Sequence, residues 1–256
     1  MSARIEDTGD RLIIWNGNSK KRGALSPELY DCINQAMRDA QNPRIRAVIL
    51  TAEGPFFCAG GNLNTIIQRR QISEAERRDR VDDLHDLVRA MRGCPVPLIA
   101  AIEGGAAGAG LSLALACDLI VAAKDAKFSA AYVKAGLVPD GGLTSAMARL
   151  LPRPLAMEMC LLGRPVTAGR FAELGAISRL VSPGKAMEEA LVLADTLAQG
   201  PREAQSVIRR LVAEAYETTE AAQLNAERDA MAAAAGKDEA AEGIAAFLEK
   251  RQPNYR

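Results

Sequence analysis

The feature that most constrains the fold is a long apolar run over residues 96–123, VPLIAAIEGGAAGAGLSLALACDLIVAA, whose only charged side chains are Glu103 and Asp118. The run predicts a strand that ends at Glu103, a glycine-rich turn, a short apolar helix and a second strand from Leu119. Both strands hardly alternate between apolar and polar residues, so both of their faces must be covered. Its most apolar part, GGAAGAGLSLALAC between Glu103 and Asp118, is too short and too rich in glycine to cross a bilayer. It therefore predicts an α/β fold with a buried sheet.

The first fifty residues show the same alternation of strand and helix. RLIIWNG (residues 11–17) and RIRAVILT (residues 44–51) are short β-branched runs typical of buried strands. The segment between them predicts a helix with Ser26 as its N-cap and Pro27 at its first position, and Asn42-Pro43 as its stop.

Helical spacing dominates the C-terminal third. PREAQSVIRRLVAEAY begins with Pro201 and predicts an amphipathic helix. Its apolar stripe consists of Ala204, Val207, Ile208, Leu211, Val212 and Ala215. The charged segment 67–80, IQRRQISEAERRDR, has little apolar periodicity. Two interpretations fit it equally well, a mobile surface segment or lid, and the solvated face of a helix.

The overall composition narrows the class of partner. The chain has 256 residues, 48% of them hydrophobic, which is enough to bury a substantial core. Its 32 basic and 32 acidic residues balance, so no net field favours nucleic acid or an anionic membrane surface, and a small-molecule partner fits better. The first ten residues, MSARIEDTGD, resemble neither a secretory signal nor a transit peptide, which predicts a cytoplasmic protein.

The five cysteines are odd in number, widely spaced and without a CxxC pair. This pattern predicts reduced, mostly buried thiols and indicates neither a disulfide framework nor a zinc site. Two nucleotide motifs are also excluded, because the glycines at 104, 105, 108 and 110 form no GxGxxG and the chain contains no GxxxxGK[ST].

Nucleophilic catalysis by a serine–histidine pair is disfavoured as well. GLSLA at residues 110–114 lacks the final glycine of a nucleophile elbow, and Ser112 falls inside the predicted apolar helix. The only histidine, His85, lies among Asp82, Asp83 and Asp86, which is typical of a solvated helix face.

Two loops of small residues remain as candidates. CAGGN at residues 58–62 follows a predicted strand, and the turn before Ser112 leads into a helix N-terminus whose amides can bind developing negative charge. The loops either form an oxyanion hole or are two tight connections that merely pack closely. A third stretch, GLVPDGG at residues 136–142, places Asp140 between a proline and two glycines, and its local chemistry favours a turn.

In their order and spacing these segments resemble the crotonase family, the enoyl-CoA hydratase/isomerase superfamily. The resemblance is carried by GALSPEL, RAVILTAEGPFFCAGGNL, the apolar run above, KFSAAYVKAGLVPDGG, LTSAMARLLP and the terminal FLEKRQPNYR. It implies an α/β fold with a spiral of ββα units over residues 1–190. It also implies a C-terminal α-helical oligomerisation region over residues 191–256 that assembles a homotrimer or a dimer of trimers.

The resemblance also implies a set of site residues. The amides of Gly61 and Ala109 fall at the oxyanion hole. The positions that bind coenzyme A are occupied by Arg22, Ala24, Ala59, Gly60, Asn62 and Leu63. Lys250 is a further candidate for the nucleotide phosphates, either in its own subunit or across a subunit boundary. The family chemistry implies an acyl-CoA thioester as substrate and no metal or cofactor beyond coenzyme A itself.

The departures from the family pattern point to one reaction. Family hydratases use two glutamates to activate water, and Ser112 and Tyr132 occupy those positions here, so hydration is disfavoured. Asp140 matches the single carboxylate of isomerase members. The resemblance therefore implies the conversion of 3-enoyl-CoA to 2-enoyl-CoA, with Asp140 as proton shuttle. The alternatives are a ring-opening isomerase of epoxyphenylacetyl-CoA, a weak enoyl-CoA hydratase and a non-catalytic acyl-CoA-binding subunit.

Overall fold

The computed structural model describes residues 2–255 and confirms the predicted α/β class. The larger of its two sheets has the strand order β1–β2–β3–β4–β6–β9, with β1 antiparallel to β2 and the other neighbours parallel. These strands are β1 (Ala3–Asp7), β2 (Arg11–Asn16), β3 (Ala47–Ala52), β4 (Leu98–Ile102), β6 (Leu119–Ala123) and β9 (Arg179–Val181). The smaller sheet contains β5 (Gly105–Ala107), β7 (Lys127–Ser129) and β8 (Val166–Thr167).

The chain winds through both sheets in a repeating ββα path. After β3 it passes Cys58, which forms a parallel bridge to Ala106, and continues into α2 (Leu63–Ile66) and α3 (Glu74–Arg92). After β4 it passes through β5 into α4 (Ala109–Ala116), and after β6 it passes through β7 into the 3₁₀ helix η3 (Ala131–Ala135). Each turn thus leaves the smaller sheet at neighbouring points, which brings three loops together.

The predicted start of the first helix is confirmed. In α1 (Pro27–Asp39) the hydroxyl of Ser26 accepts a hydrogen bond from the amide of Leu29 at 3.3 Å. The charged segment begins in η2 (Ile67–Gln71) and then enters α3, where Ser73 and Glu76 form a reciprocal capping box. Because most charged side chains of α3 are exposed, the interpretation as a solvated helix face is confirmed from Glu74 onward.

Both faces of the large sheet are covered, as the strand pattern requires. One face packs against α1, α3 and α4 in the main core cluster. The other face packs against α8 (Ala186–Ala198), whose small residues Ala186, Ala190 and Ala194 contact the apolar side chains of β3, β4 and β6. Residue 190, the predicted end of the catalytic core, therefore lies in the middle of a helix that packs on the sheet.

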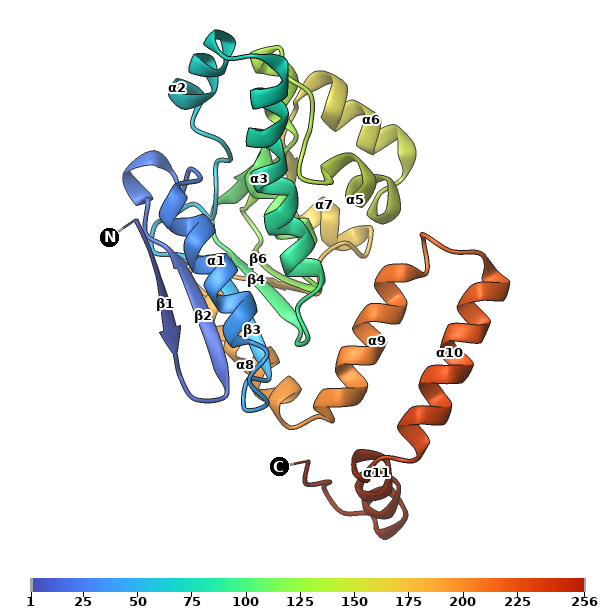
Figure 1. Cartoon of the computed structure of the whole chain (residues 1–256). Coiled ribbons are helices and arrows are strands. Elements are labelled where there is room, and N and C mark those ends of the chain that lie inside the picture. The colour runs from blue at the N-terminus through green and yellow to red at the C-terminus, as the bar shows by residue number, and fades with distance from the viewer. Residues whose placement is uncertain (1, 256) are drawn as a thin grey trace.

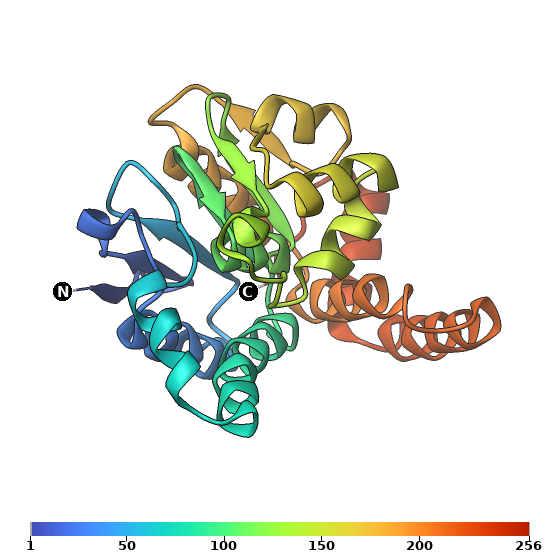
Figure 2. The same cartoon turned by 90° about the horizontal axis from the view of Figure 1, so that it is seen from above.

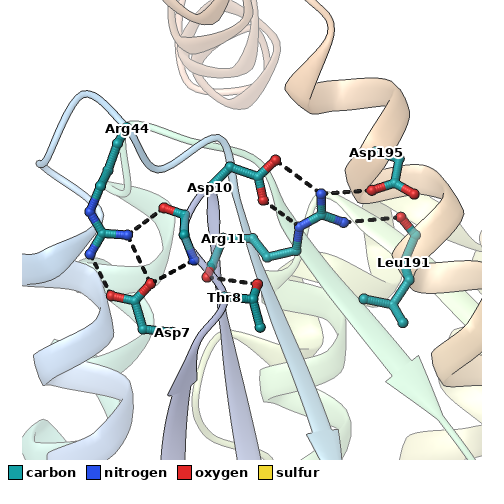
Figure 3. A network of polar contacts seen from close by, with 8 residues as sticks. Asp7, Thr8, Asp10, Arg11, Arg44, Leu191 and Asp195 are labelled. Carbon is teal, nitrogen blue, oxygen red and sulfur yellow. Dashed lines mark hydrogen bonds and ion pairs between the residues drawn. The ribbon is translucent and has the colours of Figure 1, made fainter.

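A polar network fixes the outer part of this sheet to α8 (Figure 3). The guanidinium of Arg11, whose side chain is 11% exposed, pairs with Asp10 at 2.7 Å and with Asp195 of α8 at 2.6 Å. Beside it, Arg44 pairs with Asp7, and this hydrogen-bonded contact, aided by the amide of Gly9, lowers the pKa of Asp7 to about 2.

The 3₁₀ helix η1 (Ser19–Lys21) precedes α1. The remaining helices follow β7 along the chain and are α5 (Leu143–Leu150), α6 (Arg153–Leu162), α7 (Ala168–Glu173), α9 (Arg202–Glu214), α10 (Glu220–Ala235) and α11 (Asp238–Glu249). Figures 1 and 2 show α9 and α10 side by side, projecting from the body of the molecule, and Figure 1 shows α11 near the lower end of α10. We call α9–α11 the C-terminal arm. The predicted helix after Pro201 is confirmed, but none of its residues is fully buried.

The thiols match their prediction. All five cysteines are free; Cys58, Cys94 and Cys117 are buried, and Cys32 and Cys160 are partly exposed. Burial raises the pKa of Cys58 to about 12, so this thiol stays protonated near neutral pH. No helix within residues 2–255 is both long and apolar enough to cross a membrane.

Candidate active site

The two loops of small residues lie against each other. The amide of Ala107 donates to the carbonyl of Cys58 at 2.9 Å, which joins the start of the CAGGN loop to β5. A Cβ added to Gly60 would lie 3.0 Å from the nitrogen of Ala109, and one added to Gly110 would lie 2.3 Å from the carbonyl oxygen of Cys58. Only glycine permits this approach, because any side chain would collide with backbone atoms.

The approach leaves two amide donors without internal partners. Within residues 2–255 neither the amide of Gly61 nor that of Ala109 donates a hydrogen bond to another part of the chain. Ala109 is the first residue of α4, and the N-cap Gly108, at φ 54°, supplies no side-chain cap. Free amides at a helix N-terminus attract negative charge. The geometry is compatible with an oxyanion hole, and that role stays a prediction.

Asp140 lies in the turn between η3 and α5, where hydroxyl groups hold it at two places. The hydroxyl of Tyr132 donates to Oδ1 of Asp140 at 2.7 Å, and that of Ser112 donates to the backbone carbonyl of Asp140 at 2.9 Å. The two hydroxyl oxygens are 3.5 Å apart. Gly141 follows at φ 61°, and a Cβ there would lie 2.8 Å from Cβ of Ser112. Asp140 is thus a turn residue that also belongs to a side-chain cluster.

Tyr132 connects this cluster to the paired loops. Two carbons of its ring would lie within 4 Å of a Cβ added to Gly108, the residue before Ala109. Burial raises the pKa of Tyr132, and the charge of Asp140 raises it further, so the phenol stays protonated and can donate. The structure therefore brings the predicted residues Asp140 and Ala109 together through Tyr132, and it brings Gly61 to Ala109 through Gly60.

Sequence reasoning identified Ser112 and Tyr132 by position but not their contacts with Asp140. Separations of 28 and 8 residues carry no helical or strand periodicity that could have indicated them. A second tyrosine, Tyr30 of α1, is partly buried nearby. Burial, and to a smaller extent the charge of Asp140, raises the pKa of Tyr30 to about 12. Within residues 2–255 its hydroxyl donates no hydrogen bond to Asp140.

The predicted coenzyme A positions surround the CAGGN loop. The amide of Ala59 donates to the carbonyl of Arg22 at 3.0 Å, and the amide of Leu25 donates to the carbonyl of Gly60 at 2.9 Å. The chain around Ala24 therefore runs alongside the loop. The guanidinium of Arg22 lies 4.2 Å from the ring centre of Phe56. The other two positions begin α2, where Asn62 is the N-cap and Leu63 is 59% exposed.

Lys250 lies elsewhere in the chain. It is the C-cap of α11, at φ 56°, and Figure 1 shows α11 and α2 at opposite ends of the molecule. One chain therefore does not bring Lys250 to the other predicted coenzyme A positions.

Neither residue that the sequence analysis rejected for nucleophilic catalysis is arranged for it. His85 lies on α3 with its ring nitrogen 3.6 Å from Asp82. Ser112 is buried within α4, as predicted, and is no nucleophile elbow. Among the described residues, no group of three or more His, Cys, Asp and Glu side chains is arranged to hold a metal ion.

The fold and this site define an α/β protein of spiral ββα turns in which two strand-end loops present free amides beside one carboxylate. Residues 16–256 match the model of the enoyl-CoA hydratase/isomerase family. The chain belongs to that family, as the resemblance implied.

Relatives and solved structures agree with this assignment. The chain is 34% identical to the enoyl-CoA hydratase EchA19 of Mycobacterium tuberculosis, over 99% of this chain and 96% of the relative. It is 36% identical to the 1,2-epoxyphenylacetyl-CoA isomerase of Escherichia coli, over 90% and 87%. The crystal structure of an enoyl-CoA hydratase from Polaromonas sp. JS666 superposes with a TM-score of 0.95 at 42% identity, covering 99% of both chains. The predicted crotonase-like fold is confirmed.

Proposed function

We propose that this family member shifts a double bond in an acyl-CoA thioester, converting 3-enoyl-CoA to 2-enoyl-CoA. The observation that carries the proposal is the single carboxylate of Asp140, held by the hydroxyl of Tyr132 at 2.7 Å, in a cluster that adjoins the free amide of Ala109. One base and two amide donors are the groups that an enolate mechanism needs.

The reaction follows from these groups. The amides of Gly61 and Ala109 bind the thioester oxygen and stabilise the negative charge that develops there. Asp140 removes a proton from C2, and the electron pair of the broken C–H bond forms the enolate. The same carboxyl group returns the proton at C4 while the double bond moves from C3–C4 to C2–C3. Atoms and electrons balance without a redox step, and coenzyme A enters only as part of the substrate.

Hydration is the less favoured reaction. It requires a general acid and base that hold and activate water, and the positions of the family's two glutamates carry the hydroxyls of Ser112 and Tyr132. Burial raises the pKa of Tyr132, so its phenol cannot act as a base near neutral pH. We expect slow hydration of 2-enoyl-CoA.

A second candidate function is ring-opening isomerisation of an epoxyphenylacetyl-CoA. The relative from Escherichia coli that carries this name is 36% identical over 232 residues. Such a reaction also begins beside the thioester carbonyl, so the same amides and carboxylate could serve it. Both candidates differ in substrate and not in the residues they use.

A substrate panel tests these functions. Wild type and Asp140→Asn are assayed with 3-enoyl-, 2-enoyl- and epoxyphenylacetyl-CoA. Asp140→Asn keeps the side-chain shape but cannot accept a proton, so we expect a loss of isomerisation of about 100- to 10,000-fold with acyl-CoA binding retained. Asp125→Asn, an exposed carboxylate in the turn after β6, is the matched control and should keep wild-type rates.

Three outcomes would contradict the proposal. Fast wild-type hydration would favour a hydratase, and turnover of epoxyphenylacetyl-CoA alone would favour the second candidate. Acyl-CoA binding without any turnover, unchanged in Asp140→Asn, would favour a non-catalytic binding subunit.

Coenzyme A binding and assembly complete the proposal. Arg22 and the positions around Gly60 are proposed to bind coenzyme A. The enzyme is proposed to be cytoplasmic and to assemble as a homotrimer or a dimer of trimers. The assembly is supported by the exposed apolar surface of the C-terminal arm, where Phe247 is 83% and Leu248 74% exposed. Lys250 lies beside these residues, so a neighbouring subunit is the route by which it could reach a nucleotide. A monomeric mass in light scattering at micromolar concentration would contradict this assembly.

A further inference from the structure

The two oxygens of the Asp140 carboxylate have different surroundings. Oδ1 accepts the hydrogen bond from the hydroxyl of Tyr132 at 2.7 Å. No group within residues 2–255 donates a hydrogen bond to Oδ2. Since the terminal torsion of an aspartate is soft and roughly two-fold, one firm hydrogen bond decides which oxygen is left without a partner and can act as a base.

We propose that Tyr132 is a positioning residue for this reaction, which holds Oδ1 of Asp140 so that Oδ2 faces the substrate as the base. This inference rests on the proposed function, because it assumes that Asp140 carries the proton. Tyr132 itself does not exchange a proton with the substrate in this scheme. Its role is to fix the direction of the carboxylate.

Two further contacts support a fixed arrangement. The hydroxyl of Ser112, a residue that is only 2% exposed, donates to the backbone carbonyl of Asp140 at 2.9 Å and anchors the turn. Two carbons of the Tyr132 ring would lie within 4 Å of a Cβ added to Gly108, so the ring is a neighbour of the loop that carries the amide of Ala109. The carboxylate and the amide donor therefore border one connected set of residues.

The hydrogen bond also depends on the phenol staying neutral. Burial and the negative charge of Asp140 both raise the pKa of Tyr132, so its proton remains on the phenol oxygen throughout the neutral range. A glutamate at this position would place a second negative charge next to Asp140 and would compete for the proton. The tyrosine avoids this conflict while it still occupies the position.

Tyr132→Phe is the direct test, because it removes the hydroxyl and keeps the ring against Gly108. The readouts are kcat and KM for 3-enoyl-CoA, and the exchange of C2 protons of butyryl-CoA with deuterium oxide followed by NMR. We expect kcat and the exchange rate to fall about 10- to 100-fold, as for the loss of one hydrogen bond to a charged group, with KM within about twofold. Tyr30→Phe is the matched control and should leave both rates within about twofold.

A double-mutant cycle separates positioning from a general structural effect. If Tyr132 acts through Asp140, Tyr132→Phe should have no further effect on exchange in the Asp140→Asn background, whereas a structural role would lower the residual activity there as well. Thermal unfolding of each variant shows that it is folded, and the midpoint of Tyr132→Phe should stay within a few degrees of wild type.

The outcomes distinguish this inference from the proposed function. Wild-type exchange without isomerisation would overturn the isomerase assignment but would still let Tyr132→Phe test positioning. If Tyr132→Phe keeps the kcat and the exchange rate of the wild type, the positioning role alone is overturned. The same holds if Tyr132→Phe lowers exchange equally in the wild-type and Asp140→Asn backgrounds. Undiminished exchange in Asp140→Asn would overturn both, because Asp140 would then not be the base.

Discussion

The spiral core and the C-terminal arm are built from equally regular elements but are held by different forces. In the core, all five residues of β4 and all eight residues of α4 are buried. In the arm, α9 and α10 contain no buried residue and α11 contains only Ala246. Hydrophobic burial therefore fixes the core, whereas the arm leaves large apolar side chains exposed.

What attaches the arm within one chain is a small number of arginines. Arg209 of α9, whose side chain is 8% exposed, pairs with Asp118 at 2.6 Å and donates to the carbonyls of Arg92, Cys94 and Met91. Arg202 donates to the carbonyl of Ile45 at 2.9 Å. From this difference we expect a substitution in the core to destabilise the protein by a steric clash, and a substitution in the arm to destabilise it by removing a polar contact.

The largest effect is expected from adding one methyl group to a core glycine. In Gly110→Ala the new Cβ would lie 2.3 Å from the backbone oxygen of Cys58, so the paired loops must separate. We expect the free energy of unfolding to fall by about 3 kcal/mol, measured by urea denaturation. Isomerase activity should fall with it, because the adjacent amide of Ala109 moves.

The matched control lies in the arm. In Gly236→Ala the new Cβ meets nothing closer than 3.8 Å, and φ is −90°, which alanine adopts easily. The free energy of unfolding should change by less than about 1 kcal/mol, towards greater stability. Equal destabilisation by both substitutions would break the contrast between core and arm.

An intermediate effect is expected from removing the main anchor of the arm. Arg209→Ala leaves Asp118 without its guanidinium and three carbonyls without their donor, which should cost about 2 to 3 kcal/mol. Hydrogen exchange measured by mass spectrometry should rise in α9 while β4 stays protected. Arg210→Ala, which removes only an exposed pair with Glu214, should cost less than about 0.5 kcal/mol. Faster exchange spread evenly over core and arm would count against separate anchoring.

The smallest effect is expected from acid at the end of the chain. Glu242 of α11 pairs with Arg251 at 2.7 Å and accepts from the amide of Asn254 at 2.6 Å; these contacts lower its pKa to about 2, with the Arg251 hydrogen bond as the main cause. Because the pKa is lowered, the contribution of the Glu242 contacts to the free energy of unfolding is fully present above about pH 4.5 and is lost as the pH falls towards 2. The protection of the Asn254 amide, which is the exchange rate of an unstructured peptide at the same pH divided by that of this amide, should fall in that window. Glu242→Gln should remove this pH dependence, and an unchanged profile would exclude the contact.

Much of the core could be predicted because its signals are local. Non-alternating apolar runs mark strands that are covered on both faces, and Ser26 and Pro27 mark a helix start because they supply the first turn with an acceptor and a compatible φ. The position of Asp140 in a turn follows from its neighbours for the same reason. The family resemblance added which of these local features meet.

The contacts of the site could not be predicted in the same way. Nothing in the residues near Asp140 indicates that the hydroxyls of Tyr132 and Ser112 reach it, or that Gly110 must be glycine because the carbonyl of Cys58 is so close. These contacts depend on how three loops from successive ββα turns come together, and a local pattern does not encode that approach.

The sequence by itself therefore determined the strands, the helix starts and the apolar faces, since each depends on periodicity, capping and backbone preferences within a few residues. Only the tertiary structure decided which apolar faces are covered. The helical stripe of α8 packs on the sheet, whereas that of α9 remains partly exposed, although both have helical spacing. A hydrophobic pattern specifies that a face avoids water, but which surface covers that face depends on segments far away in the chain.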